Sequence, residues 1–214
     1  METAEHITKA QLIEWLKLTA KAMTKHEDVL TRLDAAIGDA DHGINMVRGF
    51  SKVMKVLPEF ENEDIGSILK KTGMALLSSI GGVSGPLYGT FYLKGALAAS
   101  GKDSLSLNDL EEVLKRGVEG ILLRGRTEFE DKTMYDVWKP VLDTFAGVVH
   151  SGGTLEFALD SAVEAAEKGM KATIPLEAKK GRASYLGKRS IGHQDPGATS
   201  SYYIVKALRD SVCG

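Results

Sequence analysis

Three aspartates have the residue type and spacing expected of a site for divalent cations. Asp34, Asp39 and Asp41 fall within eight residues, and the last two lie between Gly38 and Gly43. Carboxylates this close together repel one another unless a cation lies between them. Mg²⁺ suits an all-oxygen set of ligands, because proteins usually hold it with a few carboxylates together with substrate phosphates and water. The spacing therefore predicts a Mg²⁺ site that also takes phosphate.

An EF-hand loop and a helix cap are the two alternatives for these carboxylates. An EF-hand loop is excluded, because the glycine comes at the fifth position counted from Asp39 and Phe50 stands where the twelfth-position glutamate would be. The remaining alternative is that Asp39 and Asp41 merely cap a helix at a solvated turn. The additional Asp34 and the flanking glycines favour the cation site.

A glycine-rich segment, residues 81–85, leads into an apolar helical stretch and is a candidate phosphate site. Glycines let the backbone approach a ligand, and the start of a helix offers free N–H groups. The segment is not a P-loop, because no Gly-Lys-Ser/Thr follows the glycines. It is not a nucleophile elbow either, because Pro86 occupies the final glycine position. A turn without a ligand accounts for this segment equally well when it is considered alone.

The longest loop, residues 179–197, is rich in basic residues and glycine. Structureless loops of this length are uncommon inside domains, so an ordered, functional segment is expected. Arg182, beside Gly181, has a planar guanidinium that could bind phosphate through two hydrogen bonds, whereas the lysines could simply be solvated. His193 could act as acid, base or ligand, or could be a structural histidine.

The segment 124–134 is the least informative of the four. Met134 opens an apolar helical face that continues with Val137, Trp138 and Val141, so core packing is its default role. Its place at the junction of loop and helix also permits contact with a flat ring.

The elements that must position these residues are helices. Apolar residues recur at helical spacing along almost the whole chain, and alternating strand patterns are essentially absent. We expect an all-α fold of about eight helices, over residues 7–37 (one long or broken element), 44–57, 65–76, 87–99, 106–123, 134–149, 154–172 and 199–212. Ser106 with Asp109 resembles a capping box, Thr154 is a candidate N-cap, and Pro86 suits a first helical position.

The order of the connections predicts where the four unusual loops meet. They alternate strictly with three ordinary turns, residues 58–63, 101–105 and 151–153. In an up-and-down antiparallel bundle every second loop lies at the same end. The alternation therefore predicts one composite site at one end of a single domain, residues 1–214.

Composition limits the classes of partner. The 27 basic and 29 acidic side chains nearly balance, so a net charge of −2 gives no reason to expect nucleic acid or a membrane as a partner, and any phosphate site must be local. The single cysteine, Cys213, excludes an internal disulfide framework and fits a reducing cytoplasm. The polar stretch 1–15 predicts no signal peptide, and no apolar run approaches a membrane span of roughly 18 residues.

Four segments together carry a family resemblance. Residues 38–43, 81–90, 131–134 and 181–200 resemble the nucleotide-binding subunit of bacterial dihydroxyacetone kinases, and the resemblance spans nearly the whole chain. It implies a barrel of eight antiparallel amphipathic helices with the nucleotide at one end, in agreement with the order of the loops.

The resemblance also implies roles for individual residues. Two Mg²⁺ ions would be held by Asp34, Asp39 and Asp41, and Arg182 would be the catalytic group that stabilises the charge on the phosphoryl group in transfer. Contacts to ADP or ATP as a bound coenzyme would come from His42, Gly43, Ile44, Asn45, Val83, Ser84, Gly125, Met134, Arg182, Asp195, Pro196 and Gly197. No protein nucleophile is required on this chain.

The family has two versions, and they imply different partners. One version uses ATP directly; the other keeps a bound ADP that a phosphohistidine protein of the sugar phosphotransferase system recharges. His42, residues 131–134 and the free-standing length resemble the second version, in which a separate subunit holds dihydroxyacetone. The alternatives are an ATP-dependent keto-sugar kinase subunit and a nucleotide-sensing module that binds a transcription regulator.

Overall fold

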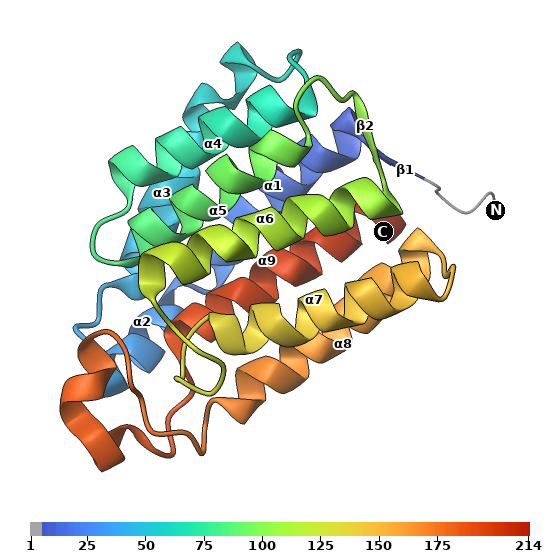
Figure 1. Ribbon diagram of the computed structural model, residues 1–214. Helices are drawn as coiled ribbons and strands as arrows, with labels where there is room; N and C mark the ends of the chain where they lie inside the picture. The colour runs from blue at the N-terminus through green and yellow to red at the C-terminus, as the bar shows by residue number, and fades with distance from the viewer. Residues whose placement is uncertain (1–5) are drawn as a thin grey trace.

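Helices make up most of the chain (Figure 1). The computed structural model describes residues 6–214, so residues 1–5, part of the stretch that predicts no signal peptide, lie outside the described residues. The α-helices are α1 (Lys9–Lys25), α2 (Glu27–Ile37), α3 (His42–Val56), α4 (Ile65–Ser79), α5 (Ser84–Ala98), α6 (Leu107–Gly125), α7 (Tyr135–His150), α8 (Leu155–Ala172) and α9 (Pro196–Cys213). Two 3₁₀ segments, η1 (Leu57–Glu59) and η2 (Arg182–Ser190), lie in connections.

The expectation that strands are absent was wrong at one place. Strand β1 (His6–Thr8) pairs antiparallel with β2 (Ser104–Ser106), with Ile7 opposite Leu105. Three residues are too few to show an alternating pattern, which is why the sequence did not reveal them. Because Ile7 belongs to β1, the first helix starts at Lys9, after an N-cap at Thr8.

The first helical element is broken rather than continuous. Helix α1 ends at Lys25 and α2 begins at Glu27, with His26 between them, so the described residues hold nine α-helices where about eight were expected. Both α1 and α2 pack against α3 and α9. Together, α1 and α2 therefore take the place of one long helix between α3 and α9. The alternation of the loops is unaffected.

The helices pack in a series that closes on itself. Each helix from α3 to α9 packs against the next, α9 packs against α1, and α1 packs against α3. Aromatic rings fill the interior, where Trp15 lies 5.6 Å from Tyr92 and Phe91 lies 4.6 Å from Trp138, measured between ring centroids. The indole N–H of Trp15 donates to the carbonyl oxygen of Ile204, which joins α1 to α9 inside the core.

Local capping agrees with most of the start signals. Ser106 and Asp109 form a capping box at α6, and Thr154 accepts a hydrogen bond from the Phe157 N–H at α8. Two starts differ from expectation. Helix α5 begins at Ser84, so Pro86 is its third residue rather than its first. Helix α9 begins at Pro196 rather than at Thr199, because Asp195 caps it.

The four unusual connections lie on one side of the molecule. They are the first loop (38–41), the second (80–83), the third (126–134) and the fourth (173–195), and Figure 1 shows them together, away from β1, β2 and the α7–α8 turn. None of the helices in the described part of the chain is long and apolar enough to span a membrane.

Close contact between α4 and α5 depends on glycine. A Cβ atom at Gly73 would lie 2.7 Å from the Gly89 carbonyl oxygen and 2.8 Å from the Leu93 side chain. We expect Gly73→Ala to lower the free energy of unfolding by roughly 1–3 kcal/mol, because the helices must move apart. The matched control is Gly147→Ala in α7, where a Cβ meets nothing within 4 Å. Gly147→Ala should stabilise the helix by about 0.5–1 kcal/mol, because alanine has less backbone freedom to lose on folding than glycine. Equal effects of the two changes in urea unfolding would contradict this picture of the α4–α5 contact.

Candidate functional site

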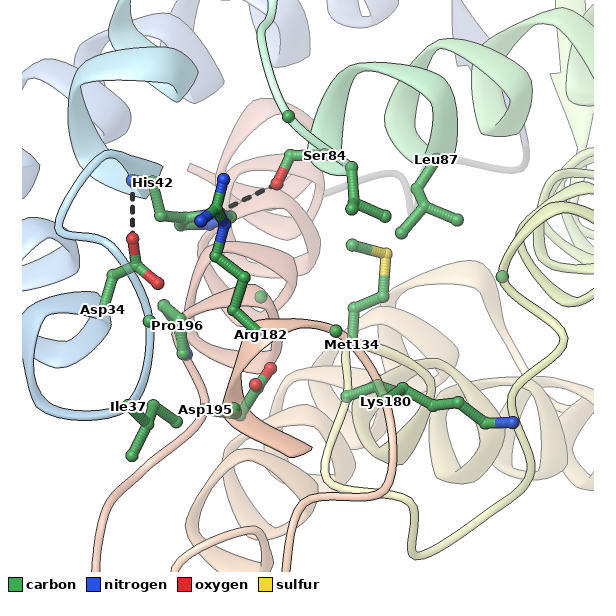
Figure 2. A pocket seen from close by; sticks show the side chains of 18 of the residues that line it. Asp34, Ile37, His42, Ser84, Leu87, Met134, Lys180, Arg182, Asp195 and Pro196 are labelled. Carbon is green, nitrogen blue, oxygen red and sulfur yellow. Dashed lines mark hydrogen bonds between the residues drawn. The ribbon is translucent and has the colours of Figure 1, made fainter. Parts of the chain in front are cut away.

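Residues of all four loops line one cavity of about 340 Å³ at the loop end (Figure 2). This volume lies within the usual size of a small-molecule site. Its lining residues combine carboxylates, basic side chains, glycines and apolar side chains; they are Asp34, Ile37, Gly38, Asp39, Asp41, His42, Gly81, Gly82, Val83, Ser84, Leu87, Ile121, Gly125, Thr127, Lys132, Thr133, Met134, Lys180, Gly181, Arg182, Ala183, Asp195, Pro196 and Gly197. The expectation that the four loops meet at one end is therefore confirmed, and their common cavity is the candidate site.

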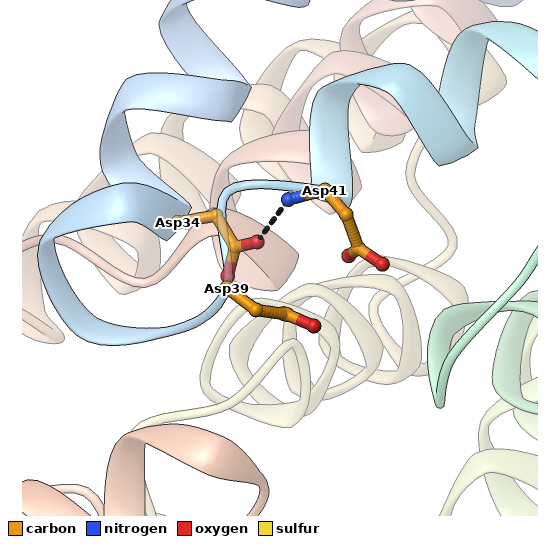
Figure 3. Close-up of side chains that lie close together, drawn as sticks. All are labelled: Asp34, Asp39 and Asp41. Carbon is orange, nitrogen blue, oxygen red and sulfur yellow. Dashed lines mark hydrogen bonds between the residues drawn. The ribbon is translucent and has the colours of Figure 1, made fainter.

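The three aspartates converge (Figure 3). One carboxylate oxygen from each of Asp34, Asp39 and Asp41 lies within 4.8 Å of the other two. Asp34, on the last turn of α2, is buried, and its Oδ2 accepts the N–H groups of Asp41 at 2.8 Å and of His42 at 3.1 Å. These hydrogen bonds hold the first loop against α2. The all-oxygen set, with an oxygen of each carboxylate facing a common point, fits a hard divalent cation such as Mg²⁺.

Arg182 reaches the acidic cluster from the fourth loop. Its Nε lies 2.9 Å from Oδ2 of Asp39, while its side chain stays 69% exposed. An ion pair this exposed contributes little to stability, typically less than about 1 kcal/mol. The guanidinium can therefore exchange Asp39 for another anion at small cost.

His42 is a buried residue with both ring nitrogens engaged. Nδ1 lies 3.0 Å from the Ser84 hydroxyl and Nε2 lies 2.9 Å from the Ser200 hydroxyl. Burial lowers the pKa of His42 to about 4, although Asp34 and Asp41 act in the opposite direction. The imidazole is therefore neutral near pH 7, and it positions the second loop through Ser84.

The hydroxyl network continues from His42 into α9. The Ser200 hydroxyl lies 2.7 Å from the Tyr88 hydroxyl, which also donates to the Gly197 carbonyl oxygen and lies 2.9 Å from the Ser201 hydroxyl. The start of α9 is thus tied to the second loop and to α5. Local sequence pattern did not point to Tyr88, Ser200 or Ser201, because their partners are far away along the chain.

Apolar side chains form one wall of the cavity. Met134, at the start of α7, points its sulfur toward Leu87 of α5, as Figure 2 shows. Ile121 of α6 is another apolar lining residue, and Gly125 leaves room, because a Cβ there would lie 3.3 Å from the Leu87 side chain. A surface of this kind suits a flat, uncharged ring.

Asp195 also lines the cavity. It is buried, and its Oδ2 accepts the Ala198 N–H at 2.7 Å, which caps α9. Burial raises the pKa of Asp195 to about 7, with Asp136 and Asp34 adding to the shift and the Ala198 N–H and Lys132 opposing it. Pro196 and Gly197 follow it along the cavity wall.

Three of the expected contact residues do not line the cavity. A Cβ at Gly43 would lie 2.3 Å from the Glu27 carbonyl oxygen, so this residue packs against α2. Ile44 is half exposed, and Asn45 is buried and accepts a hydrogen bond from Arg48. The side chains of Ile44 and Asn45 thus lie outside the cavity lining, and nucleotide contacts at Gly43, Ile44 and Asn45 stay a prediction. Any contact that Gly43 or Ile44 makes to a ligand would come from the N–H groups of the first turn of α3.

The cavity also contains residues that the sequence did not single out. Thr127 and Thr133 of the third loop and Lys180 of the fourth line it. Lys132 lines it too, yet its ammonium group is buried among carbonyl oxygens. His193, in contrast, has an exposed side chain outside the lining, and its backbone carbonyl oxygen accepts a hydrogen bond from Lys132.

The repulsion among the aspartates predicts opposite effects of two substitutions. Asp41→Asn removes one negative charge, so we expect it to leave the unfolding free energy unchanged or slightly raised without metal. It should abolish the rise in melting temperature that Mg²⁺ produces. Asp34→Ala removes the acceptor of two backbone N–H groups and should lower the unfolding free energy by about 1–3 kcal/mol even without metal.

The control for both variants is Asp103→Asn, a surface carboxylate paired with Lys9. Thermal unfolding with and without Mg²⁺ makes the comparison. Full Mg²⁺-dependent stabilisation in Asp41→Asn would remove Asp41 from the proposed cation site.

Comparison with known proteins places this chain in a family. Residues 36–210 match the model of the DAK2 domain. The chain is 47% identical over 202 residues to the ADP-binding subunit of the PEP-dependent dihydroxyacetone kinase of Escherichia coli K12, covering 94% of this chain and 96% of that protein. It is 40% identical over 201 residues to the ADP-binding subunit of the PTS-dependent dihydroxyacetone kinase of Lactococcus lactis, covering 94% and 96%.

A solved structure shares the fold. The dihydroxyacetone kinase of C. freundii superimposes with a TM-score of 0.73 at 22% identity, and the match covers 99% of this chain and 36% of that one. The chain belongs to the DAK2 domain family, and to the same sequence family as the bacterial ADP-binding subunits.

Proposed function

We propose that this chain is the nucleotide-carrying subunit of a dihydroxyacetone kinase. It holds ADP with Mg²⁺, accepts a phosphoryl group onto the ADP from a phosphohistidine protein of the phosphotransferase system, and passes the group to dihydroxyacetone on a separate subunit. The observation that carries the proposal is a single cavity that joins three convergent carboxylates, a basic loop and an apolar wall. The names of relatives up to 47% identical support the same assignment.

The chemistry of the cavity walls suggests how a nucleotide is oriented. The apolar wall of Leu87, Ile121 and Met134 takes the adenine ring, and the acidic end takes the phosphates with their metal. Helices α3, α5 and α9 all begin at this cavity, and helix N-termini favour anions. The positive ends of three helices thus compensate the negative charge that a nucleotide brings.

Asp34, Asp39 and Asp41 are the residues that would hold Mg²⁺, and we propose two ions. The support for two is that three carboxylates exceed the charge of a single divalent ion, while the nucleotide phosphates add further negative charge. When bound, Mg²⁺ neutralises phosphate oxygens and so favours transfer of a phosphoryl group. The C. freundii dihydroxyacetone kinase, which shares the fold, has been solved in complex with AMP-PNP and Mg²⁺, and this supports the proposal that Mg²⁺ binds together with nucleotide.

Arg182 is the proposed catalytic group of this chain. It sits on a loop, it is exposed, and it already faces the acidic cluster. On nucleotide binding it exchanges Asp39 for phosphate oxygens and stabilises the charge of the group in transfer. His42 does not exchange protons in this scheme; it holds Ser84 in place.

The architecture proposed for this function is a single domain, residues 1–214, in which antiparallel helices form a barrel with the nucleotide at one end. The closed series of helix contacts supports the barrel. The convergence of alternate loops on one cavity supports the antiparallel order. We place the protein in the cytoplasm, where its lone cysteine stays reduced and its phosphodonor is found.

The donor distinguishes this proposal from an ATP-dependent keto-sugar kinase. The D-erythrulose kinase of Mycolicibacterium smegmatis is 31% identical, and the match covers 90% of this chain but only 34% of that longer protein. The bacterial ADP-binding subunits are both more similar and matched over nearly their whole length. A separate substrate subunit and a separate phosphodonor are therefore the favoured partners. A transcription regulator stays a hypothesis without an observation of its own.

Arg182→Ala should affect transfer far more than stability. We expect the rate of phosphoryl transfer to fall by roughly 10²- to 10³-fold, because a charge-stabilising donor is lost. The unfolding free energy should change by less than about 1 kcal/mol, because the side chain is exposed. Arg189→Ala, in the same loop but outside the cavity lining, is the control. A loss of activity that the control shares would point to general disturbance of the loop.

The nucleotide should behave as a resident coenzyme. Tight enclosure is expressed mainly as slow dissociation, so bound ADP should be recharged in place rather than exchanged for ATP at each turnover. The test combines the purified chain, the substrate subunit and dihydroxyacetone, and compares ATP with a phosphohistidine donor protein. We expect sustained turnover with the donor alone. Multiple turnover on ATP, with labelled nucleotide exchanging as fast as product forms, would instead support the ATP-dependent alternative.

A further inference from the structure

The ammonium group of Lys132 lies in a cage of backbone carbonyls. Its Nζ donates to the carbonyl oxygens of Thr173 at 2.6 Å, Leu176 at 3.1 Å and His193 at 2.5 Å, and lies 3.4 Å from that of Ile174. The side chain is only 1% exposed. An ammonium has three protons, and more than three carbonyl oxygens surround it. No proton is therefore left over for a phosphate in the adjoining cavity.

Backbone dipoles, rather than a carboxylate, compensate this buried charge. In the part of the chain that the structure describes, no carboxylate oxygen lies within ion-pair distance of Lys132 Nζ. Asp195 and Asp136 act from farther away and oppose the fall in the pKa of Lys132 that burial causes. A buried charge without partners is very costly, so the carbonyl cage must stay assembled around Lys132.

The four carbonyls belong to the two ends of the fourth loop. Three come from the segment where the chain leaves α8, and the fourth comes from His193, just before α9. The two ends are also joined by the Gly192 N–H, which donates to the Ile174 carbonyl oxygen, and by the Asp195 N–H, which donates to the Thr173 hydroxyl. Farther along the loop, the Ala178 N–H donates to the Ser190 hydroxyl. Between them the loop carries η2 and Arg182 over the cavity.

Lys132 also couples the fourth loop to the third. Its backbone has a φ of 61°, a left-handed conformation that is uncommon for a residue other than glycine. The carboxylate of Asp136 accepts the N–H groups of Glu130 and Thr133 on either side, which holds this turn. Two residues later comes Met134, in the apolar wall. Lys132 thus links the loop of Arg182 to the loop of Met134 from inside the protein. Nearer the surface, Lys179 and Lys180 also contact Asp131 of the third loop.

We propose that Lys132 is a positioning residue, which clamps the two ends of the fourth loop and so places Arg182 opposite the acidic cluster. The consequence for nucleotide retention rests on the proposed function, whereas the clamp itself does not. Loss of the clamp loosens the two ends of the loop while the helical core stays packed, and the contacts of Lys179 and Lys180 with Asp131 remain. Retention of ADP then falls, because one wall of its enclosure moves.

The first test is hydrogen exchange in the nucleotide-free chain. In Lys132→Met we expect the amides of Ala178 and Gly192 to exchange at least about tenfold faster than in the native chain, while amides of α5 exchange as before. Lys188→Met, an exposed lysine of the same loop, is the matched control and should leave these rates unchanged. Native rates at Ala178 and Gly192 in Lys132→Met would overturn the proposal. If Lys132→Met does not fold, Lys132→Gln, which keeps N–H donors without the charge, replaces it.

The second test is rescue of Lys132→Ala by propylammonium, which supplies the missing carbons and charge. In Lys132→Ala we expect propylammonium to restore slow exchange at Gly192 and slow ADP dissociation in a saturable way. Without rescue, Lys132→Met should accelerate ADP dissociation by about tenfold or more. Equal recovery with 1-propanol would overturn the proposal, because filled volume rather than charge would then be what the loop needs. If the native chain fails to bind ADP, the proposed function falls, while the exchange comparison still decides whether Lys132 is the clamp.

Discussion

Negative charge concentrated at one end of the helices is the constraint on which the site depends. Asp34, Asp39 and Asp41 bring three carboxylate oxygens within 4.8 Å of one another, and carboxylates so close need positive compensation. The chain supplies some of it. Backbone N–H groups of Asp41 and His42 bind Asp34, and Arg182 reaches across from the fourth loop to Asp39. The negative charge that remains on the three carboxylates can be balanced by a divalent cation. Such a cation can in turn bind a phosphate.

The same end of the molecule contains two buried side chains that link separate segments by hydrogen bonds. His42 is neutral and joins the second loop to α9 through two hydroxyl groups. Lys132 joins the ends of the fourth loop through backbone carbonyls. Neither side chain offers a free polar atom to a ligand, yet each contacts a segment that carries a residue able to do so. His42 contacts Ser84 directly, and Lys132 is proposed to act on Arg182 through the ends of the fourth loop.

The helical class and the meeting of the loops were predictable from the sequence because both follow from local pattern. Apolar spacing marks helices wherever they are long, and the alternation of plain and unusual connections marks one end of a bundle. The strands β1 and β2 could not be predicted, because three residues are too few to show an alternating apolar pattern. The break at His26 separates two helices by one residue, and no proline or glycine marks it.

Residues that line the cavity could be predicted where the residue type indicates the chemistry, but not where the backbone or a distant partner decides the position; their roles stay predictions. The three aspartates, Ser84, Met134 and Arg182 all reach the cavity. Gly43 turned out to pack on α2, and Asn45 to bond with Arg48. The roles of Tyr88 and Lys132 depend on contacts with residues 41 to 113 positions away, which local spacing cannot reveal.

The central claim is that one cavity binds nucleotide and divalent metal as a unit. It is tested most directly by measuring the affinity of the purified chain for ADP across a range of Mg²⁺ concentrations. Linkage requires that Mg²⁺ strengthen ADP binding by the same factor by which ADP strengthens Mg²⁺ binding. We expect this factor to be at least about tenfold, the equivalent of 1.4 kcal/mol. An ADP affinity that is the same with Mg²⁺ and with a chelator would contradict the assignment of the aspartates, the cavity and the function together.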